Sequence, residues 1–294
     1  MFPPNQQTVL ITGATDGIGR AVAARFAQLG ATVLLHGRDD ERLEETRDEI
    51  ARRTGAADLH CLKADLSSLA EVDALADEVA RRVDHLNLLV SNAGVGFGPP
   101  DGPREVSRDG YELRFAVNHL AAHHLARRLE PLLAAGAPSR IVQVASVGQE
   151  ALDPDDLLTE HDWDGVRAYR RSKLAQIMSA FDHAEELRDT GVVVHVLHPA
   201  TLMDTTMVRD AEQEPHSTLE DGLTAVVRLT LDPTLDEVSG RFFAGPREAP
   251  EHLHEQVGDA EVRALVRRRT RELVRAALSD GAGNADEEDD RAAA

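Results

Sequence analysis

The stretch Thr8-Val9-Leu10-Ile11-Thr12-Gly13-Ala14-Thr15-Asp16-Gly17-Ile18-Gly19 decides the fold of this chain. Its first five residues form an apolar, β-branched run that is typical of a buried strand. The glycine-rich turn follows directly, and an amphipathic helix then extends to about Leu29. A glycine turn lets the backbone approach a phosphate closely, and the helix N-terminus supplies free N–H groups and a favourable dipole. The context predicts a phosphate-binding turn, with a plain strand-to-helix connection as the alternative.

Strands and helices alternate along the rest of the chain, which predicts one doubly wound α/β domain with a parallel sheet of about seven strands. The expected strands are 8–12, 32–37, 58–63, 86–91, 140–146, 192–198 and 241–244. The expected helices include 39–54, 68–83, a long one over 111–133, one that ends near 190, 217–231 and 259–278. Residues 1–7 form an N-terminal extension, the domain spans 8–279, and 280–294 is a disordered acidic tail that buries nothing.

Composition narrows the classes of partner and location. The formal net charge of -20 argues against nucleic acid and anionic membranes as partners. The single cysteine, Cys61, excludes an intrachain disulfide and fits a reducing cytoplasm. Residues 1–7 do not resemble a signal peptide, and no apolar run approaches the ~20 residues that span a bilayer. We expect a cytoplasmic protein; its acidic, lysine-poor composition fits either a high-salt cytoplasm or a GC-rich genome.

Tyr169 and Lys173 stand four residues apart in a predicted helix, and the chain has only two tyrosines and two lysines. Residues with this spacing share one face of a helix. An ammonium beside a phenol favours the phenolate and lowers the tyrosine pKa from its usual value of about 10. The pair is therefore a candidate proton donor and acceptor, and an ordinary exposed helix pair is the alternative.

Several motifs follow one another in a characteristic order: Thr12-Gly13-x-x-x-Gly17-Ile18-Gly19, Asp65-Leu66, Asn92-Ala93-Gly94, Asn118, Ser146 after a strand, and Tyr169-x-x-x-Lys173. In this order they resemble the short-chain dehydrogenase/reductase family, which has a Rossmann-type fold. The resemblance extends from about Val9 to Ala244. The run 109–120 and the long spacing from Ser146 to Tyr169 are most similar to the retinol-dehydrogenase-like, WW-domain-oxidoreductase-like branch.

The resemblance implies a nicotinamide cofactor, and the end of the second strand favours NADP, with NAD second. An NAD site usually has an acid where this chain has Gly37, and Arg38 follows with donors for a 2′-phosphate. Asp16 counts against NADP, since relatives often carry a basic residue there, and Arg38 could instead be a solvated surface residue. The cofactor-binding set is Gly13, Thr15, Asp16, Gly17, Ile18, Gly19, Arg38, Asp65, Leu66, Asn92, Ala93, Gly94, Tyr169, Lys173, Pro199, Thr201 and Thr205.

Within that set, the family pattern gives particular residues particular parts of the nucleotide. Asp65 and Leu66 would contact the adenine, and the turn 92–94 would border the adenosine ribose. After Pro199 the family's usual glycine is replaced by Ala200, so the threonine that holds the nicotinamide carboxamide is ambiguous. Thr205 is the first choice and Thr201 the second.

The family chemistry is hydride transfer between nicotinamide and a carbonyl or alcohol carbon. By resemblance, Tyr169 is the general acid or base, and Lys173 lowers its pKa and holds the nicotinamide ribose. Ser146 polarises the substrate oxygen, and Asn118 holds a water that links Lys173 to solvent. A catalytically idle NADP-binding sensor is the alternative, although it predicts a broken Ser–Tyr–Lys set. A nucleotide-sugar epimerase-like enzyme would need a larger C-terminal domain.

The expected partner is a small carbonyl or alcohol substrate, with no nucleic acid or membrane, and the chain could form a homodimer or homotetramer. Two segments, about 147–165 and 199–216, would border the substrate. The apolar side chains Phe97, Trp163, Leu202, Met203 and Met207 suggest an apolar pocket, and a role in the core is as reasonable. The scattered histidines do not have metal-ligand spacing, so no metal is expected.

Overall fold

The computed structural model describes residues 1–161 and 163–292, which form an eight-stranded sheet in the order β3-β2-β1-β4-β5-β6-β7-β8. The strands are β1 (Thr8–Ile11), β2 (Thr32–Gly37), β3 (Leu59–Lys63), β4 (Leu88–Ser91), β5 (Ser139–Val144), β6 (Val192–His198), β7 (Arg241–Ala244) and β8 (Arg247–Glu248). All neighbours pair in parallel except β7 and β8. This confirms the predicted doubly wound α/β fold, and β8 adds a short antiparallel edge strand.

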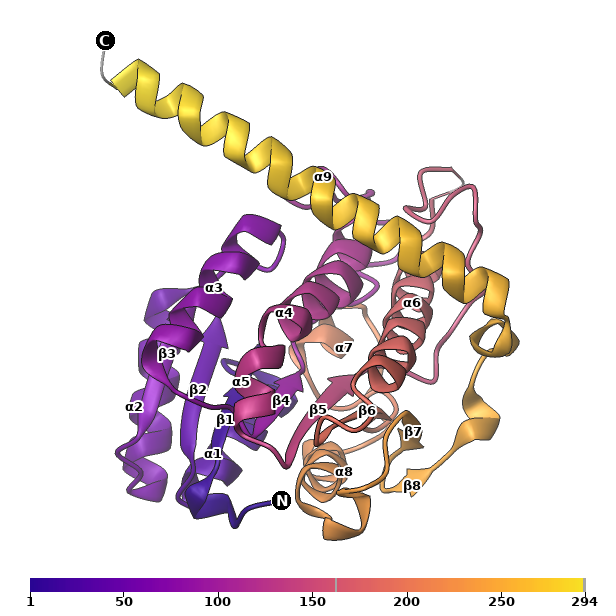
Figure 1. The fold of residues 1–294 in the computed structure, drawn as a ribbon. Helices are drawn as coiled ribbons and strands as arrows, with labels where there is room; N and C mark the ends of the chain where they lie inside the picture. The colour runs from indigo at the N-terminus through magenta and orange to yellow at the C-terminus, as the bar shows by residue number, and fades with distance from the viewer. Residues whose placement is uncertain (162, 293–294) are drawn as a thin grey trace.

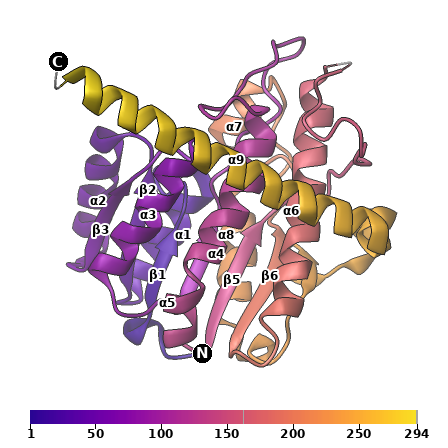
Figure 2. The same cartoon turned by 45° about the horizontal axis from the view of Figure 1, so that its top comes forward.

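Helices cover both faces of the sheet (Figures 1 and 2). One face carries α1 (Gly17–Gln28), α2 (Asp40–Thr54) and α8 (Leu219–Leu231). The other carries α3 (Leu69–Arg82), a π-helix η2 (Phe115–Ala121), α4 (Ala122–Arg128), α5 (Glu130–Ala135) and α6 (Gly165–Glu186). The short elements are α7 (Thr206–Asp210), η1 (Pro4–Gln6), η3 (Pro233–Leu235), η4 (Pro250–His252) and η5 (Glu255–Gly258).

Local sequence explains why these helices form and which face they bury. In α3, the Ser68 hydroxyl caps the N-terminus by accepting from the Glu71 N–H. The apolar residues of α3 recur at helical spacing and are all buried against the sheet: Leu69, Val72, Leu75, Ala76 and Val79. The remaining positions of α3 are largely charged, so the helix has one face for the core and one for water.

The long helix predicted over 111–133 is wrong, because the structure divides it into η2, α4 and α5. Leu129 separates α4 from α5, and Pro131 lies in the first turn of α5. Proline has no N–H to donate, so the helical hydrogen-bond pattern of α4 cannot continue through it. The π-helix carries Asn118 and widens the turn at a point that faces α6.

The last helix, α9 (Ala260–Ala292), crosses the outside of α3 and α6, and its C-terminal part projects beyond the body of the protein (Figure 1). Val266, Thr270 and Ala277 bury it against the helical layer. The helix thus continues past Leu278, where the sequence predicts its end. That residues 280–294 contribute nothing to packing stays a prediction.

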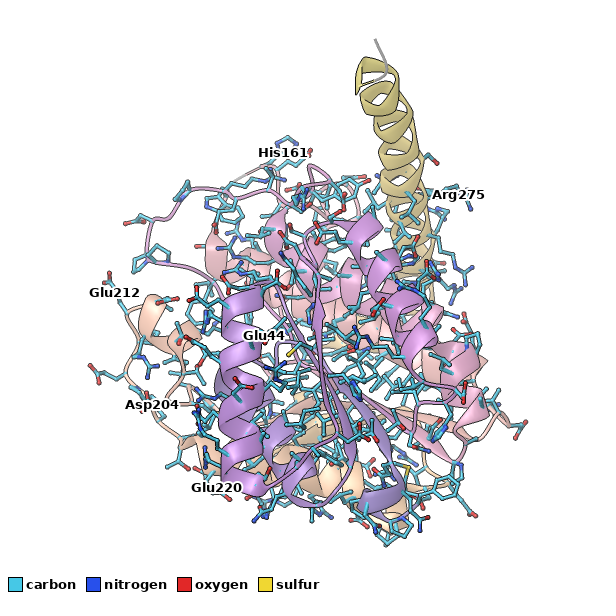
Figure 3. All side chains as sticks on the ribbon, turned by 90° about the vertical axis from the view of Figure 1, so that its left-hand side faces the viewer. Glu44, His161, Asp204, Glu212, Glu220 and Arg275 are labelled. Atoms are coloured by element: carbon cyan, nitrogen blue, oxygen red, sulfur yellow. The ribbon has the colours of Figure 1, made fainter. Side chains whose placement is uncertain are left out.

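The surface of the described residues is strongly acidic. Glu44, Asp204, Glu212 and Glu220 are exposed and point outward from α2, the segment after β6 and α8 (Figure 3). Within residues 1–161 and 163–292, no helix combines the length and apolar character that crossing a bilayer requires.

Deleting residues 281–294 is expected to leave the melting temperature, the turnover and the assembly size unchanged. The segment has no apolar periodicity, so it cannot offset the entropy cost of its own ordering. Val266→Ala serves as the contrast, because it removes a buried contact of α9 and should cost on the order of 1–3 kcal/mol of unfolding free energy. Thermal melting and sizing chromatography decide; a clear change on truncation would make the segment structural.

Candidate active site

The carboxyl ends of the parallel strands bring the predicted site residues to one edge of the sheet. Gly13 follows β1, Asn92 follows β4, and Ser146 lies just after β5. The chain leaves β1 toward α1 on one face and leaves β4 toward η2 on the other face. Ligands of such sheets bind in the crevice where the connections diverge in this way. The topology therefore places the expected ligand position between β1 and β4, beside the glycine turn.

The glycine turn is closely packed and pre-formed. Gly13 and Gly17 have φ angles of +65° and +49°, in the left-handed region that glycine adopts without strain. A Cβ on Gly19 would lie 2.1 Å from the Gly13 carbonyl oxygen. Asn92 ties the turn to the end of β4, since its Nδ2 donates to the Thr12 and Gly13 carbonyls at 2.9 and 3.2 Å. The space at this turn exists because its glycines have no Cβ. It fits a nucleotide pyrophosphate at the start of α1.

His36 is a supporting residue that the sequence analysis missed. The Gly13 N–H donates to His36 Nδ1 at 3.2 Å, and His36 Nε2 lies 3.1 Å from the Ala64 carbonyl oxygen. Burial lowers the pKa of His36 to about 4, so the ring is neutral and bridges the ends of three strands. The signal available in the sequence was a histidine at the end of an apolar strand, one residue before Gly37.

Arg38 and Asp65 follow the ends of β2 and β3, where the adenosine part of the cofactor is predicted to bind. Arg38 is exposed at the end of β2, and among the described residues its side chain has no ion pair or hydrogen bond. Gly37 leaves room for Thr15, whose Cγ2 would lie 2.8 Å from an added Cβ. Asp65 Oδ1 accepts from the Ser67 N–H at 2.9 Å. The Leu66 side chain is buried in the core, so only its backbone is placed to meet a base.

Tyr169 lies in the first turns of α6, with its hydroxyl hydrogen-bonded to the Ser146 side chain. The Phe97 ring packs edge-on against the tyrosine ring, with centroids 5.4 Å apart. Burial raises the pKa of Tyr169 above its usual value, and the hydrogen bond from Ser146 lowers it by a smaller amount. The expected lowered pKa is therefore wrong for this cofactor-free structure, because desolvation of the phenolate is the larger effect.

Lys173 is almost fully buried one turn further along α6, and its Nζ lies 5.8 Å from the centroid of the Tyr169 ring. The Nζ donates to the Val144 carbonyl at 3.0 Å and to Gln176 Oε1 at 3.1 Å. Burial lowers the pKa of Lys173 to about 7. The ammonium is thus held by two neutral acceptors behind the tyrosine.

Asn118 is fully buried in η2, and its side chain is used within the protein. Its Nδ2 donates to the Val95 carbonyl and to Ser172 Oγ, both at 3.0 Å, and its Oδ1 accepts from the Val95 N–H at 2.7 Å. The side chain therefore ties the segment after β4 to α6. Both Nδ2 hydrogens are used, so a water held by Asn118 would bind Oδ1 or the backbone, and that predicted role stays a prediction.

The segment after β6 lies over the glycine turn. An added Cβ on Gly17 would lie 3.4 Å from Thr205 Cγ2, whereas Thr201 Oγ1 is 3.1 Å from His198 Nε2. Thr205 is thus the threonine against the turn, and which of the two holds the cofactor stays a prediction. Met207 packs on Gly96, where an added Cβ would lie 2.6 Å from its Cγ.

Met203 belongs to the core and not to a substrate pocket. Its sulfur would lie 2.4 Å from a Cβ on Gly222 of α8, and Ile18 contacts the same glycine. The interpretation of Met203 as a packing residue therefore holds in this structure.

A buried arginine, which the sequence analysis missed, forms the wall beside Tyr169. Arg114 Nη2 donates to the Phe97 carbonyl at 3.3 Å, and its guanidinium lies 5.2 Å from the Trp163 ring centroid. Arg114 is also paired with the buried Glu112 at 3.1 Å. These contacts connect Trp163 through Arg114 to Phe97, which packs on Tyr169, and that the two rings line a substrate pocket stays a prediction.

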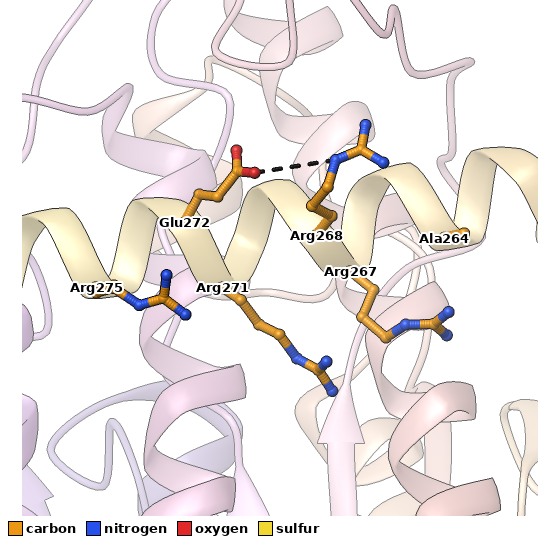
Figure 4. Close-up of a pocket in the computed structure, with 6 residues that line it drawn as sticks. All are labelled: Ala264, Arg267, Arg268, Arg271, Glu272 and Arg275. Carbon is orange, nitrogen blue, oxygen red and sulfur yellow. Dashed lines mark ion pairs between the residues drawn. The ribbon is translucent and has the colours of Figure 1, made fainter.

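A second hollow, of about 340 Å3, lies on the outer surface of α9, far from this edge of the sheet (Figure 4). It is lined by Ala264, Arg267, Arg268, Arg271, Glu272 and Arg275. All six residues belong to one helix, and Arg268 is paired with Glu272. The hollow has none of the chemistry-bearing groups and is not the active site. Among the described residues, no group of three or more histidine, cysteine or acidic side chains could hold a metal ion.

Residues 7–216 match the short chain dehydrogenase family. The chain belongs to this family and is an NAD(P)-dependent oxidoreductase.

Human retinol dehydrogenase 14 is 34% identical over 270 residues, which are 82% of this chain and 79% of that protein. Mouse polyprenol dehydrogenase is 32% identical over 306 residues, covering 97% of this chain and 88% of that protein. A short chain dehydrogenase structure from Escherichia coli in complex with NADPH superposes with a TM-score of 0.68 and 26% identity, covering 83% of this chain and 98% of that chain. The retinol-dehydrogenase-like resemblance is thereby confirmed.

Lys173→Met is expected to gain stability relative to the wild type below pH 7 and to lose that gain at higher pH. The pKa of Lys173 is about 7 in the folded protein against an ordinary 10.5. Between these values the unfolded wild type binds more protons, so its stability rises with pH in that window. Thermal melts of both proteins from about pH 6 to pH 10 test this. A pH-independent difference would mean that Lys173 is not buried as an ammonium.

Proposed function

We propose that this protein is an NADP-dependent reductase or dehydrogenase of apolar carbonyl and alcohol compounds, with Tyr169 as its general acid or base. The observation that carries the proposal is the hydrogen-bonded pair of Tyr169 and Ser146 in front of a buried Lys173. The pair lies at the edge of the sheet where the glycine turn fits a dinucleotide. A shared hydrogen bond brings both hydroxyl groups within reach of one substrate oxygen.

The bound nicotinamide supplies or accepts the hydride, and the protein's own residues handle the proton and the substrate oxygen. In reduction, Ser146 Oγ donates a hydrogen bond to the carbonyl oxygen, and the Tyr169 hydroxyl gives that oxygen its proton as the carbon gains the hydride. In oxidation, the phenolate takes the alcohol proton. Because burial raises the pKa of Tyr169, the hydroxyl is protonated at neutral pH, which favours the reductive direction.

Lys173 has two roles in this proposal. Its ammonium donates to the ribose hydroxyls of the nicotinamide nucleotide, and its charge stabilises the phenolate that forms when Tyr169 loses its proton. Gly94 supports the first role, since an added Cβ there would lie 3.7 Å from the Nζ. Gly94 thus brings its backbone close to the Nζ with no side chain between them.

The proposed preference for NADP rests on Arg38. The guanidinium is exposed at the end of β2. The last residue of this strand is Gly37, so the position from which an acid would bind a ribose 2′-hydroxyl carries no side chain. A 2′-phosphate there would gain charge-assisted hydrogen bonds from Arg38. NAD remains the second choice.

An apolar substrate is favoured by the walls of the site and by the relatives. Phe97, Trp163 and Met207 border the approach to Tyr169 with little polar surface. Relatives similar over most of this chain are named for retinol and polyprenol. We propose that the protein acts on alcohols or carbonyl compounds with a large apolar group.

Tyr169→Phe is expected to remove turnover while NADPH binding stays nearly unchanged, because it deletes the transferable proton and keeps the ring. General acid–base catalysis supplies on the order of 10²–10⁴-fold in rate. The measurement is NADPH absorbance with a panel of aldehydes, ketones and secondary alcohols, and NADPH fluorescence for binding. Tyr111→Phe is the matched control, since this tyrosine donates to the Leu273 carbonyl, far from the site. Turnover of Tyr169→Phe within a few-fold of the wild type would refute the assignment.

Arg38→Asp is expected to shift the kcat/KM ratio of NADP over NAD toward NAD by on the order of tenfold to a hundredfold, since a phosphate loses its guanidinium and the ribose gains a carboxylate. Arg42→Asp makes the same charge change at an exposed position of α2 and controls for it. An unchanged ratio in Arg38→Asp would make Arg38 a surface residue.

A further inference from the structure

A chain of hydrogen bonds extends from Lys173 away from the catalytic face. Gln176 follows Lys173 by three residues on α6, and its Oε1 accepts from the Lys173 Nζ at 3.1 Å. Its Nε2 donates in turn to Gln143 Oε1 of β5 at 3.0 Å. Both glutamines are almost fully buried. The ammonium is therefore connected to two amides in series that the reaction, as described above, does not use.

The orientation of the Gln176 amide is determined at both ends. An ammonium has three donors and no acceptor, so only the amide oxygen of Gln176 can face it. The amide NH₂ then points toward Gln143 and needs an acceptor there, which Gln143 Oε1 provides. Gln143 thus keeps the oxygen of Gln176 directed at Lys173, and neither amide can turn over without losing a buried hydrogen bond.

The chain ends at a small polar cavity of about 10 Å3, which is the size of one water molecule. The cavity is lined by His119, His123, Gln143, Gln176, Ser179, Ala180 and His183. His119 Nε2 is 2.7 Å from Thr270 Oγ1 of α9, and His119 Nδ1 is buried with no partner among the described residues. This unpaired nitrogen and the glutamine amides give the cavity the polar groups that one bound water requires.

Among the described residues, no side chain of opposite charge contacts Lys173 from the elements that pack around it. On α6 the titratable neighbour is Tyr169, and β5 contributes only the Val144 carbonyl and Gln143. Behind the amides, burial lowers the pKa of His119 to about 3 and the pKa of His123 well below its usual value, so both rings are neutral. The ammonium therefore depends on neutral acceptors to replace the water that it has lost.

We propose that Gln176 is a positioning residue of the reaction, which holds Lys173 as an ammonium toward Tyr169, and that Gln143 orients Gln176 for this purpose. The proposal rests on the proposed function, because Lys173 matters only if Tyr169 exchanges a proton. Without the Gln176 oxygen, the buried ammonium has one protein acceptor fewer and is more easily deprotonated. A neutral Lys173 no longer stabilises the phenolate, so the Tyr169 pKa rises.

The test replaces Gln176 by leucine, which keeps the volume and removes the acceptor. Two readouts follow Lys173 and its effect on the reaction: the pH profile of kcat in alcohol oxidation, and the side-chain NMR signals of lysine-labelled protein in a pH titration without substrate. The chain has two lysines, so subtracting the titration of Lys173→Met leaves the signal of Lys173 alone. Far-UV circular dichroism at each pH restricts the readings to folded protein.

In Gln176→Leu, the titration midpoint of Lys173 is expected to fall by about 0.5–1 pH unit, with a lower kcat near neutral pH and a nearly unchanged KM for substrate. Gln143→Leu removes the acceptor that orients the Gln176 amide, so it should give a smaller shift in the same direction. This variant replaces Gln176→Leu in the test if Gln176→Leu does not fold. Ser179→Ala is the matched control, because it lines the same cavity on α6 and does not touch Lys173.

Midpoints of Gln176→Leu and Gln143→Leu that coincide with the wild type would overturn the proposal, and so would an equal shift in Ser179→Ala. A wild type without turnover on any carbonyl or alcohol would instead refute the proposed function. The lysine titration needs no turnover, so it distinguishes that failure from a failure of the Gln176 assignment.

Discussion

The junction between β1 and β4 is the contact from which the rest of the site is built. Asn92 donates from β4 into the carbonyls of Thr12 and Gly13, and Gly19 of α1 packs so closely on Gly13 that no side chain fits between them. Adjacent parallel strands whose connections leave on opposite faces open a crevice at this point. Because Asn92 ties the glycine turn to the end of β4, this part of the site has a defined geometry, and the ends of β5 and β6 add Ser146 and the segment 199–216 beside it.

Behind this floor the protein keeps several polar side chains in its interior. Lys173, Gln176 and Gln143 form one series, and Arg114 with Glu112 forms another beside Phe97. Each buried polar group costs free energy unless it is fully hydrogen-bonded, and a core designed only for stability would replace most of them with apolar residues. Their position around Tyr169 indicates a functional role. A phenol that transfers a proton needs charged groups and neighbouring side chains in fixed positions where water is excluded.

Sequence patterns predicted the sheet well, since each strand is a short apolar run followed by a turn, and these are local signals. The seven predicted strands all exist, while the long helix over 111–133 fails at Pro131 and at the π-helix around Asn118. The pattern of apolar residues there is continuous, so only the packing of η2 against α6 reveals the wider turn. The sequence also left the role of Met203 open between a substrate pocket and the core. Its contact with α8 in the tertiary structure makes it a core residue.

The sequence by itself determined the strand–turn–helix start, the order of the motifs and the family, because these depend on residues close together in the chain. Only the tertiary structure decided the direction of the Tyr169 pKa, since that direction depends on how much water the fold removes from the hydroxyl. It also decided the partners of His36, Arg114 and Gln176. Their contacts join residues from separate strands, helices and loops, and hydrogen bonds between such distant segments have no signature in a single sequence.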